Sequence, residues 1–198
     1  MCIRDSSCAE LNVGGRPLCR NIRLTVRARE KLCICGHNGV GKSTLLHLIR
    51  DTLEKRSDLR VFYMPQDAGD LLDFSLSPVE LLSPSGEKED RSRAGILLGS
   101  MKFTADEMNH PSAGLSGGQK AKLMFLMMAQ SGANVLLLDE PTRNLSPLSG
   151  PVIRELLAEY PGCIITVSHD RRLIQEVCTR TVTLTPEGVR PSSFCDNF

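Results

Sequence analysis

The chain has 198 residues, of which 41% are hydrophobic and 24% charged, and its formal net charge is +1. This is ordinary globular composition, and the length suits one α/β domain or a domain with a small subdomain. A charge so close to zero singles out neither nucleic acid nor a membrane surface as a partner. No apolar run approaches the roughly 20 residues of a membrane span, and the N-terminus lacks a secretory pattern. We therefore expect a cytoplasmic protein without direct membrane insertion.

Eight cysteines are present, and their spacing argues against a disulfide scaffold. No CxxC pair offers a zinc or redox site. Cys33 and Cys35 alternate along an apolar strand pattern, so their side chains share one face, and we expect both to be small core residues.

Hydrophobic periodicity and turn residues predict the elements of the first third of the chain. Residues 1–7 show no periodicity, whereas 11–26 alternate apolar and polar positions around a Gly-Gly pair, which predicts two antiparallel strands with a turn. A buried strand at 31–35 runs into a glycine-rich loop, a helix begins within 44–49, and 59–64 form another strand.

The stretch 67–115 differs from its surroundings, because three prolines and several serines separate short helical pieces. It predicts an inserted helical subdomain. The remaining predicted elements are an apolar helix at 120–130, a strand at 134–138, a helix at 147–160, a strand at 163–167, a helix at 170–177, and a strand with a turn at 179–190. Strands that alternate with helices imply an α/β fold with a parallel core sheet.

The strongest chemical signal is the segment GHNGVGKST at 36–44, which follows a predicted strand and opens a predicted helix. Glycines let the backbone curl until successive amides face one point, and this nest binds phosphate together with the helix N-terminus. Lys42 offers a point charge to the β- and γ-phosphates of a nucleotide, and Ser43 offers its hydroxyl to Mg²⁺. The alternative, a plain glycine turn before a helix, does not require Lys and Ser at these offsets.

The second signal is the segment VLLLDEPT at 135–142. Its apolar run predicts a central strand that delivers Asp139 and Glu140 to its C-terminal end, where α/β sheets bind ligands. Asp139 can hold Mg²⁺, and Glu140 can polarise an attacking water as a general base. By itself, a strand that ends in two acids is a solvated strand end about as often as it is a catalytic site. The phosphate loop earlier in the chain favours the catalytic interpretation.

The third signal is LSGGQK at 115–120, just before the apolar helix. Ser116 and the amides of Gly117 and Gly118 form a second anion site at a helix N-terminus. One domain does not need two phosphate sites. Two facing domains do need them, because each domain would complete the ATP-binding site of the other. A lone Ser-Gly-Gly turn is weak evidence, and the order of the three motifs strengthens it.

Together with SHD at 168–170, these segments resemble the Walker A, signature, Walker B and switch-histidine motifs of the ATP-binding-cassette (ABC) ATPases. The motifs stand in the family's order, and the resemblance covers about residues 8–190. It implies a P-loop NTPase cassette with a parallel core sheet, a small antiparallel β subdomain, and a helical subdomain at about 67–130. Without the family, His169 would be a lone histidine at a strand end, which is more often structural.

The resemblance implies that ATP and Mg²⁺ are the ligands and that a second ABC cassette, in tandem or as a homodimer, is needed for full ATPase activity. It implies Glu140, His169 and Gln66 as catalytic residues, and Ser43, Gln66 and Asp139 as metal ligands. The nucleotide contacts that it implies are Gly36, His37, Asn38, Gly39, Val40, Gly41, Lys42, Ser43, Thr44, Ser116, Gly117, Gly118 and Gln119.

A finer resemblance is to the ABC-F subfamily, the soluble tandem-cassette proteins that act on ribosomes. The string YPGCIITVSHDRRLIQEVC at 160–178 is similar to that subfamily's usual sequence around the switch histidine, and the short helical insert also fits. This implies a translation or antibiotic-resistance factor with the ribosome and its RNA as partners. The alternative is the ATP-binding subunit of a membrane transporter. An upstream cassette with a charged linker, or a neighbouring gene with several membrane spans, would separate the two.

Three features depart from the family pattern. No Phe, Tyr or Trp precedes Phe62, although the family usually stacks an aromatic near the first strands on adenine. Ser146 stands where the D-loop usually carries an aspartate, which puts coupling between two cassettes in doubt. The third departure is that one cassette is present, without the charged helical linker of ABC-F proteins.

The first residues offer an explanation for the single cassette. MCIRDS is what a common adapter used in DNA library preparation would encode. We therefore expect residues 1–7 to be a non-native N-terminal segment and the chain to be the second cassette of a longer protein. The cassette then spans 8–190, and 191–198 form a C-terminal tail.

The early strands are locally basic, with Glu30 the only acid among them. This surface can contact ribosomal RNA phosphates. A solvated β face is the simpler interpretation, because the net charge is near zero and no aromatics are interleaved. The basic residues are Arg16, Arg20, Arg23, Arg27, Arg29 and Lys31.

Overall fold

The structure is a computed structural model that describes residues 2–13, 16–145, 147 and 149–192, with only the backbone in 2–21 and 23. Two antiparallel strands, β1 (Cys2–Val13) and β2 (Arg16–Arg27), form a sheet of their own. These are the two strands predicted within 11–26. Residues 2–7, whose sequence shows no periodicity, extend β1 to Cys2 by backbone pairing with β2. The predicted turn at 14–15 lies outside the described residues.

A six-stranded sheet forms the core, in the order β4-β5-β6-β3-β7-β8. All of its neighbouring strands are parallel except β8, which pairs antiparallel with β7. The parallel core sheet is therefore confirmed, and the strand and turn predicted at 179–190 form a hairpin of two strands. The strands are β3 (Lys31–Cys35), β4 (Val61–Met64), β5 (Val135–Asp139), β6 (Cys163–Val167), β7 (Arg180–Thr185) and β8 (Gly188–Ser192).

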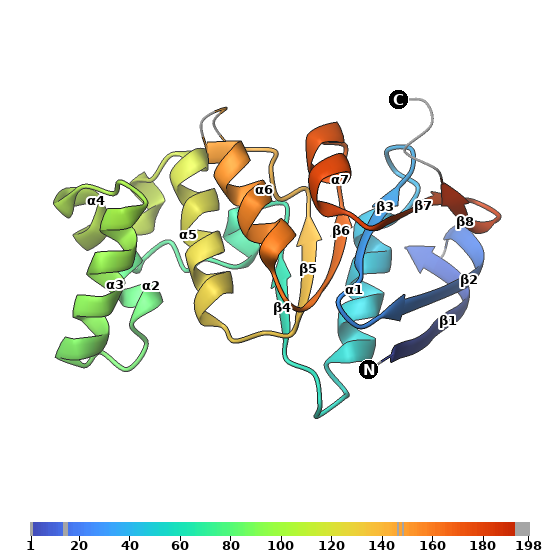
Figure 1. Ribbon diagram of the computed structural model, residues 1–198, viewed down its shortest axis with the longest axis horizontal. Coiled ribbons are helices and arrows are strands. Elements are labelled where there is room, and N and C mark those ends of the chain that lie inside the picture. Colours follow the sequence, from blue (N-terminus) through green and yellow to red (C-terminus); the bar gives the residue numbers. More distant parts are fainter. Residues whose placement is uncertain (1, 14–15, 146, 148, 193–198) are drawn as a thin grey trace.

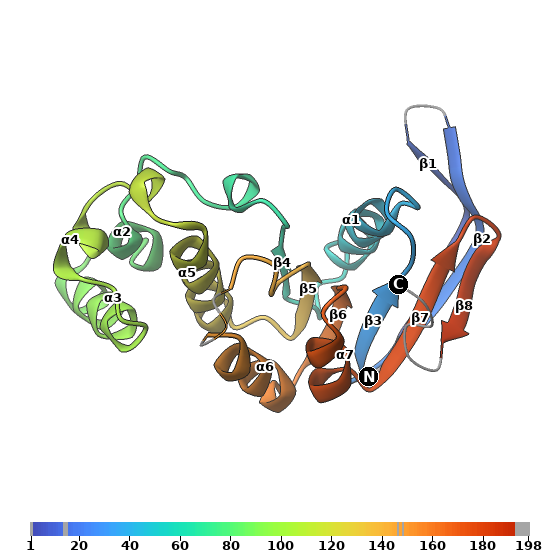
Figure 2. The ribbon, with the colours of Figure 1, turned by 90° about the horizontal axis from the view of Figure 1, so that it is seen from above.

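Helices cover both faces of this sheet (Figure 2). On one face, α1 (Lys42–Leu53) packs together with apolar residues of β2. The opposite face is covered by α5 (Gly117–Gln130), α6 (Ser149–Glu159) and α7 (Arg171–Val177). Every residue of β5 is buried, and successive side chains of this strand pack alternately into the apolar clusters on the two faces of the sheet. Such a doubly covered strand reads as a continuous apolar run, which is the pattern VLLL that predicted it.

The chain between β4 and β5 is helical, as predicted, and most of it lies to one side of the sheet (Figure 1). Capping boxes begin two of its short helices, from Ser77 to Glu80 and from Thr104 to Glu107. Buried residues of α3 and α5 share one apolar cluster, which fastens these helices to the core. The elements are η1 (Ala68–Asp70), α2 (Pro78–Leu82), α3 (Lys88–Ser100), α4 (Ala105–Asn109), η2 (Ser112–Gly114) and α5.

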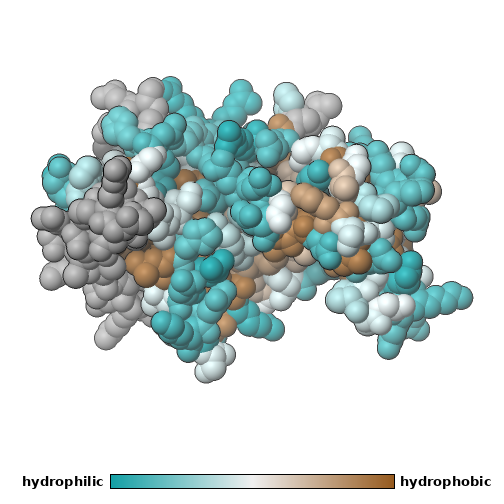
Figure 3. Space-filling view, turned by 180° about the vertical axis from the view of Figure 1, so that it is seen from behind, coloured by the Kyte–Doolittle hydropathy of each residue, from teal (hydrophilic) through white to brown (hydrophobic). Residues whose placement is uncertain are grey.

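Within the described ranges, no helix combines the length and the apolar character that crossing a membrane requires. The face in Figure 3 is mostly hydrophilic, with small apolar patches. Cys33 and Cys35 are buried as predicted, but Cys35 is also disulfide-bonded, which the spacing of the cysteines did not predict. Of the predicted C-terminal tail, 191–192 belong to β8 and 193–198 lie outside the described residues.

Candidate functional site

The loop between β3 and α1 carries the glycine-rich segment. Gly36, Gly39 and Gly41 have φ angles of 147°, 82° and 101°, which residues with side chains rarely adopt. A Cβ on Gly36 would lie 2.7 Å from the carbonyl oxygen of Leu184, whereas a Cβ on Gly39 would meet nothing within 4 Å. Gly36 is therefore required for space as well as for conformation. Gly41 precedes α1 without a side-chain cap, so the first amides of the helix face the loop and can bind an anion.

Lys42 begins α1 and is only 8% exposed. Its Nζ donates to the carbonyl oxygens of Gly36 at 2.7 Å and of His37 at 3.0 Å. Burial lowers the pKa of the Lys42 amine, and the negative charges of Glu140 and Asp139 oppose that shift. The ammonium is thus held against the loop by neutral carbonyls, which leaves its charge available to a phosphate.

Asp139 ends strand β5 and is 3% exposed. Its Oδ1 has no hydrogen-bond partner among the described residues. A buried carboxylate oxygen without a partner is costly, and a cation would satisfy it. Ser43 and Gln66 line the same cavity, and hydroxyl, amide and carboxylate oxygens are the ligands that Mg²⁺ prefers. The residues predicted to bind the metal therefore fit Mg²⁺.

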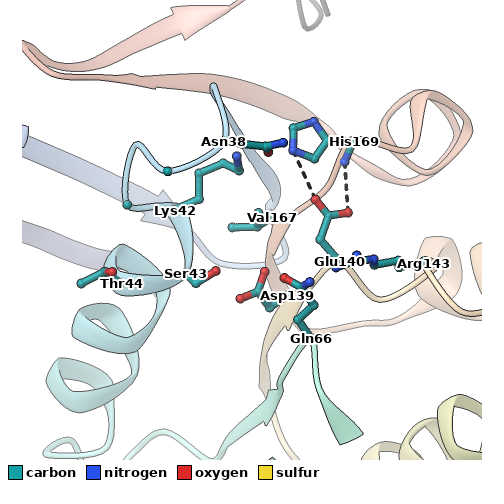
Figure 4. A pocket seen from close by; sticks show the side chains of 12 residues that line it. Asn38, Lys42, Ser43, Thr44, Gln66, Asp139, Glu140, Arg143, Val167 and His169 are labelled. Atoms are coloured by element: carbon teal, nitrogen blue, oxygen red, sulfur yellow. Dashed lines mark hydrogen bonds and ion pairs between the residues drawn. The ribbon is translucent and has the colours of Figure 1, made fainter. Parts of the chain in front are cut away.

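Glu140 follows Asp139 in a left-handed conformation with a φ angle of 48°. Its backbone N–H donates to the carbonyl oxygen of Val167 at 2.9 Å. Strain of this kind costs about 1–3 kcal/mol and is concentrated at functional sites. Here the turn directs the carboxylate toward His169 (Figure 4).

The carboxylate of Glu140 contacts His169 twice. Its Oε2 accepts a hydrogen bond from the backbone N–H at 3.3 Å, and its Oε1 lies 3.5 Å from Nε2 of the imidazole. Burial raises the pKa of the Glu140 carboxyl, and the contact with the His169 N–H partly offsets this. A carboxylate with a raised pKa is a stronger base near neutral pH.

The neighbours of His169 fix its place after β6. Ser168 is fully buried, and its hydroxyl accepts from the backbone N–H of Asp170 at 3.0 Å. Asp170 in turn caps α7, since its Oδ1 accepts from the N–H groups of Arg172 and Leu173 at 2.9 and 3.3 Å. The sequence motif SHD thus places an imidazole between a buried hydroxyl and a helix cap.

A cavity of about 810 Å³ lies between the phosphate loop and the ends of β5 and β6. Gly36, His37 and Val40 belong to the loop without lining the cavity. Arg143 and Val167 line it as well, and sequence reasoning missed both. The signal for Arg143 was a basic residue directly after DEPT. The predicted site residues that line the cavity are Asn38, Gly39, Gly41, Lys42, Ser43, Thr44, Gln66, Asp139, Glu140 and His169.

The signature segment lies elsewhere, at the N-terminus of α5. Ser116 and Gln119 form a capping box, with Ser116 Oγ accepting from the Gln119 N–H at 3.3 Å and Gln119 Oε1 accepting from the Ser116 N–H at 2.8 Å. Ser116, Gly118 and Gln119 do not line the phosphate-loop cavity, and Gly117 lines only a neighbouring cavity of about 520 Å³. The signature segment therefore does not line the phosphate-loop cavity, although Gly117 and Ser43 both line the neighbouring one. Ser146 of the predicted D-loop lies outside the described residues.

A glycine-rich loop between a buried strand and a helix, together with two acids at the end of another parallel strand of the same sheet, defines a P-loop nucleotide-binding domain. Comparison with known families agrees, because the family model described as "ABC transporter" matches residues 19–143. The chain belongs to the ABC transporter family, and the matched part is its ATP-binding cassette.

Individual relatives share a limited part of their length with this chain. It is 34% identical to the probable ATP-binding protein YbiT of Escherichia coli O157:H7, over 87% of this chain and 34% of that protein. It is also 34% identical to ABC transporter F family member 5 of Arabidopsis thaliana, over 83% of this chain and 25% of that protein. The chain thus spans about a third or less of the length of these curated relatives.

Solved structures share the fold. One is the ATP-binding cassette MJ0796, described as a dimer in a post-hydrolysis state bound to ADP and Pi. It matches with a TM-score of 0.78 at 21% identity, over 100% of both chains.

Proposed function

We propose that this chain binds Mg-ATP at the phosphate loop and hydrolyses it together with a second cassette. One observation carries the proposal. Lys42, Ser43, Asp139 and Glu140 line one cavity, and the buried Oδ1 of Asp139 has no hydrogen-bond partner in the described part of the chain. A triphosphate with its magnesium ion supplies the anion for Lys42 and the cation for Asp139.

The residues of the cavity divide the chemistry between them. The loop amides and Lys42 bind the β- and γ-phosphates, while Ser43, Gln66 and Asp139 are the residues that would hold Mg²⁺. When bound, Mg²⁺ neutralises charge that develops on the phosphate oxygens. A water molecule attacks the γ-phosphorus, the bond to the β-phosphate oxygen breaks, and ADP leaves.

Glu140 and His169 handle the proton of that water. The carboxylate of Glu140 accepts it, and the raised pKa of Glu140 favours this transfer. The contacts of His169 with both oxygens of Glu140 hold the carboxylate in one orientation. The imidazole is then placed to contact the γ-phosphate.

The signature segment supplies the reason for a second cassette. The N-terminus of α5 is an anion site, yet it does not line the phosphate-loop cavity of its own domain. Two cassettes that face each other place each signature segment against the partner's ATP. The solved relative MJ0796 is described as a dimer with ADP and Pi, which supports this arrangement. A single chain then binds ATP but hydrolyses it slowly, and a linker in a tandem protein would raise the effective concentration to about millimolar.

We further propose that the whole protein is an ABC-F translation or antibiotic-resistance factor that acts in the cytoplasm on the ribosome. Support comes from the F-family name of the Arabidopsis relative and from the SHDRR string after β6. A second candidate, the ATP-binding subunit of a membrane transporter, is favoured by the description of the matching family model.

A co-sedimentation experiment separates the two candidates. The full-length gene product with Glu140→Gln should bind ATP without completing hydrolysis and should then pellet with ribosomes only when ATP is present. Glu155→Gln, an exposed position on α6, is the matched control and should show no such trapping. ATP-dependent attachment to membranes that carry a transporter partner, with none to ribosomes, would overturn the ABC-F assignment and retain the chemistry.

A further inference from the structure

Gln119 of the signature segment is fixed by a residue that belongs to no sequence motif. Its Nε2 donates to Oε1 of Glu107 at 2.6 Å, while its Oε1 accepts from the Ser116 N–H at 2.8 Å. Both ends of the Gln119 amide are therefore engaged, and the side chain has one orientation. Glu107 belongs to α4, so the contact joins the N-terminus of α5 to a separate short helix.

Glu107 is itself firmly placed. Its Oε2 accepts from the Thr104 N–H at 2.8 Å, and its own N–H donates to Thr104 Oγ1 at 3.3 Å. One carboxylate oxygen thus belongs to the capping box at the N-terminus of α4, and the other accepts the hydrogen bond from Gln119. The Thr104 N–H holds the pKa of Glu107 below its usual value, so the group is ionised at neutral pH.

A carboxylate beside an anion site would repel a phosphate unless its charge were balanced. Lys122 supplies a balancing charge, and its effect also lowers the pKa of Glu107. The Nζ of Lys122 donates to the Met101 carbonyl oxygen at 3.2 Å, which holds this cation at the C-terminal end of α3. Glu107 therefore fixes Gln119 through hydrogen bonds while its repulsion of an anion is reduced.

We propose that Glu107 is a positioning residue of the signature segment. It holds Gln119 so that the capping box stays closed and the amides of Gly117 and Gly118 stay aimed at the ATP of the facing cassette. This role rests on the proposed function, in which that ATP binds at the N-terminus of α5. The contact also transmits any shift of α4 to the segment that meets the phosphate.

The chain offers a matched control for this role. Glu80 forms the same capping box at α2, where its Oε2 accepts from the Ser77 N–H at 2.8 Å and its N–H donates to Ser77 Oγ at 3.3 Å. No hydrogen bond joins Glu80 to the signature segment among the described residues. Removing either glutamate opens one capping box of the helical subdomain, but only Glu107→Ala also releases Gln119.

The experiment has two readouts on folded variants of the Glu140→Gln chain. The first is exchange of the Ser116 amide hydrogen without nucleotide, which requires no second cassette. The second is Mg-ATP-dependent association in the analytical ultracentrifuge. Glu107→Ala should speed Ser116 exchange and weaken association, each by about tenfold, the usual weight of a hydrogen bond to a charged group. Glu80→Ala and Thr104→Ala should leave both readouts within about twofold of the parent.

A milder variant covers the case in which Glu107→Ala does not fold. Glu107→Gln has one acceptor oxygen in place of two, so it can keep the α4 cap or the contact with Gln119, but not both. It should change both readouts in the same direction and by less.

Three results would overturn the positioning role of Glu107, and a fourth would overturn the pairing of two cassettes. Ser116 exchange that is unchanged in the folded Glu107 variants, or a Glu80→Ala variant that behaves like Glu107→Ala, would overturn the positioning role. Faster exchange with unchanged ATP-dependent association would overturn it as well, since Gln119 would then be released without consequence. A parent that never associates with ATP, while Ser116 still responds to Glu107→Ala alone, would overturn the pairing of two cassettes and leave the local role of Glu107 intact.

Discussion

The phosphate loop and the signature segment both lie at a helix N-terminus, but they are built differently. At the phosphate loop, Lys42 and Asp139 are nearly buried, and the Oδ1 of Asp139 has no partner in the described residues. At the signature segment, Ser116 is exposed, and its capping box with Gln119 is complete within the chain. The first site thus contains a buried carboxylate oxygen that a bound cation would satisfy. The second is locally satisfied, which agrees with the proposal that its ligand is the ATP of a facing cassette.

The largest expected effect lies at the phosphate loop and concerns Glu140. Glu140→Gln keeps the shape of the side chain and removes its basicity, so hydrolysis should fall by about 10²–10⁴. ATP should still bind, because Lys42, Ser43 and the loop amides are unchanged. A phosphate-release assay measures the rate of hydrolysis, and equilibrium binding of labelled ATP measures the affinity. Lost binding would mean that Glu140 is structural, and retained hydrolysis would move the base elsewhere, with His169 the next candidate.

Lys42→Ala removes a cation that donates to the carbonyl oxygens of Gly36 and His37. ATP affinity should fall by more than about tenfold, or 1.4 kcal/mol, while the fold persists. Isothermal titration with ATP measures this, and Lys88→Ala in α3, away from the cavity, serves as the control. Affinity within about threefold of the parent would contradict the assignment of Lys42 to phosphate.

Two glycines of the loop separate conformational strain from lack of space. Gly36→Ala would place a Cβ 2.7 Å from a carbonyl oxygen and should destabilise the fold by about 2–4 kcal/mol. Gly39→Ala meets no atom within 4 Å, so only its positive φ matters, and about 1 kcal/mol is expected. Urea unfolding of both variants gives the difference. Equal losses would mean that the approach of β7 to the loop does not matter.

The smallest effect is a loss of stability with rising pH at the phosphate-loop site, whereas the lowered pKa of Glu107 at the signature segment gives the opposite dependence. Burial raises the pKa of Glu140 in the folded chain, so between the ordinary glutamate pKa and that raised value the folded state binds more protons than the unfolded state. The free energy of unfolding of the parent should therefore fall as the pH rises through this window. Glu140→Gln should lack this loss, and its relative stability should grow with pH. Urea titrations without metal or nucleotide test this, and a difference that stays constant with pH would contradict it.

The sequence was most informative where chemistry and local spacing coincide. The phosphate loop, Asp139 and Glu140 could be placed because a buried strand must deliver its last residues to the ligand edge of a parallel sheet. The contact between Glu107 and Gln119 could not be predicted, since it depends on how α4 packs beside α5. Arg143 was missed for a similar reason, because the turn after β5 decides where its side chain points. The extension of β1 to Cys2 could not be predicted from the sequence, because backbone pairing needs no periodicity.

The central claim is that each chain supplies half of two ATP sites, and complementation tests it most directly. Lys42→Ala removes a working phosphate loop, and Ser116→Arg blocks the signature segment. Each variant alone should be inactive, whereas a mixture contains pairs that join an intact phosphate loop from one chain to an intact signature segment from the other. ATP hydrolysis that reappears on mixing, and rises with protein concentration, is the predicted result. A mixture no more active than the two variants measured separately, beside a parent that hydrolyses ATP as a monomer, would contradict the account.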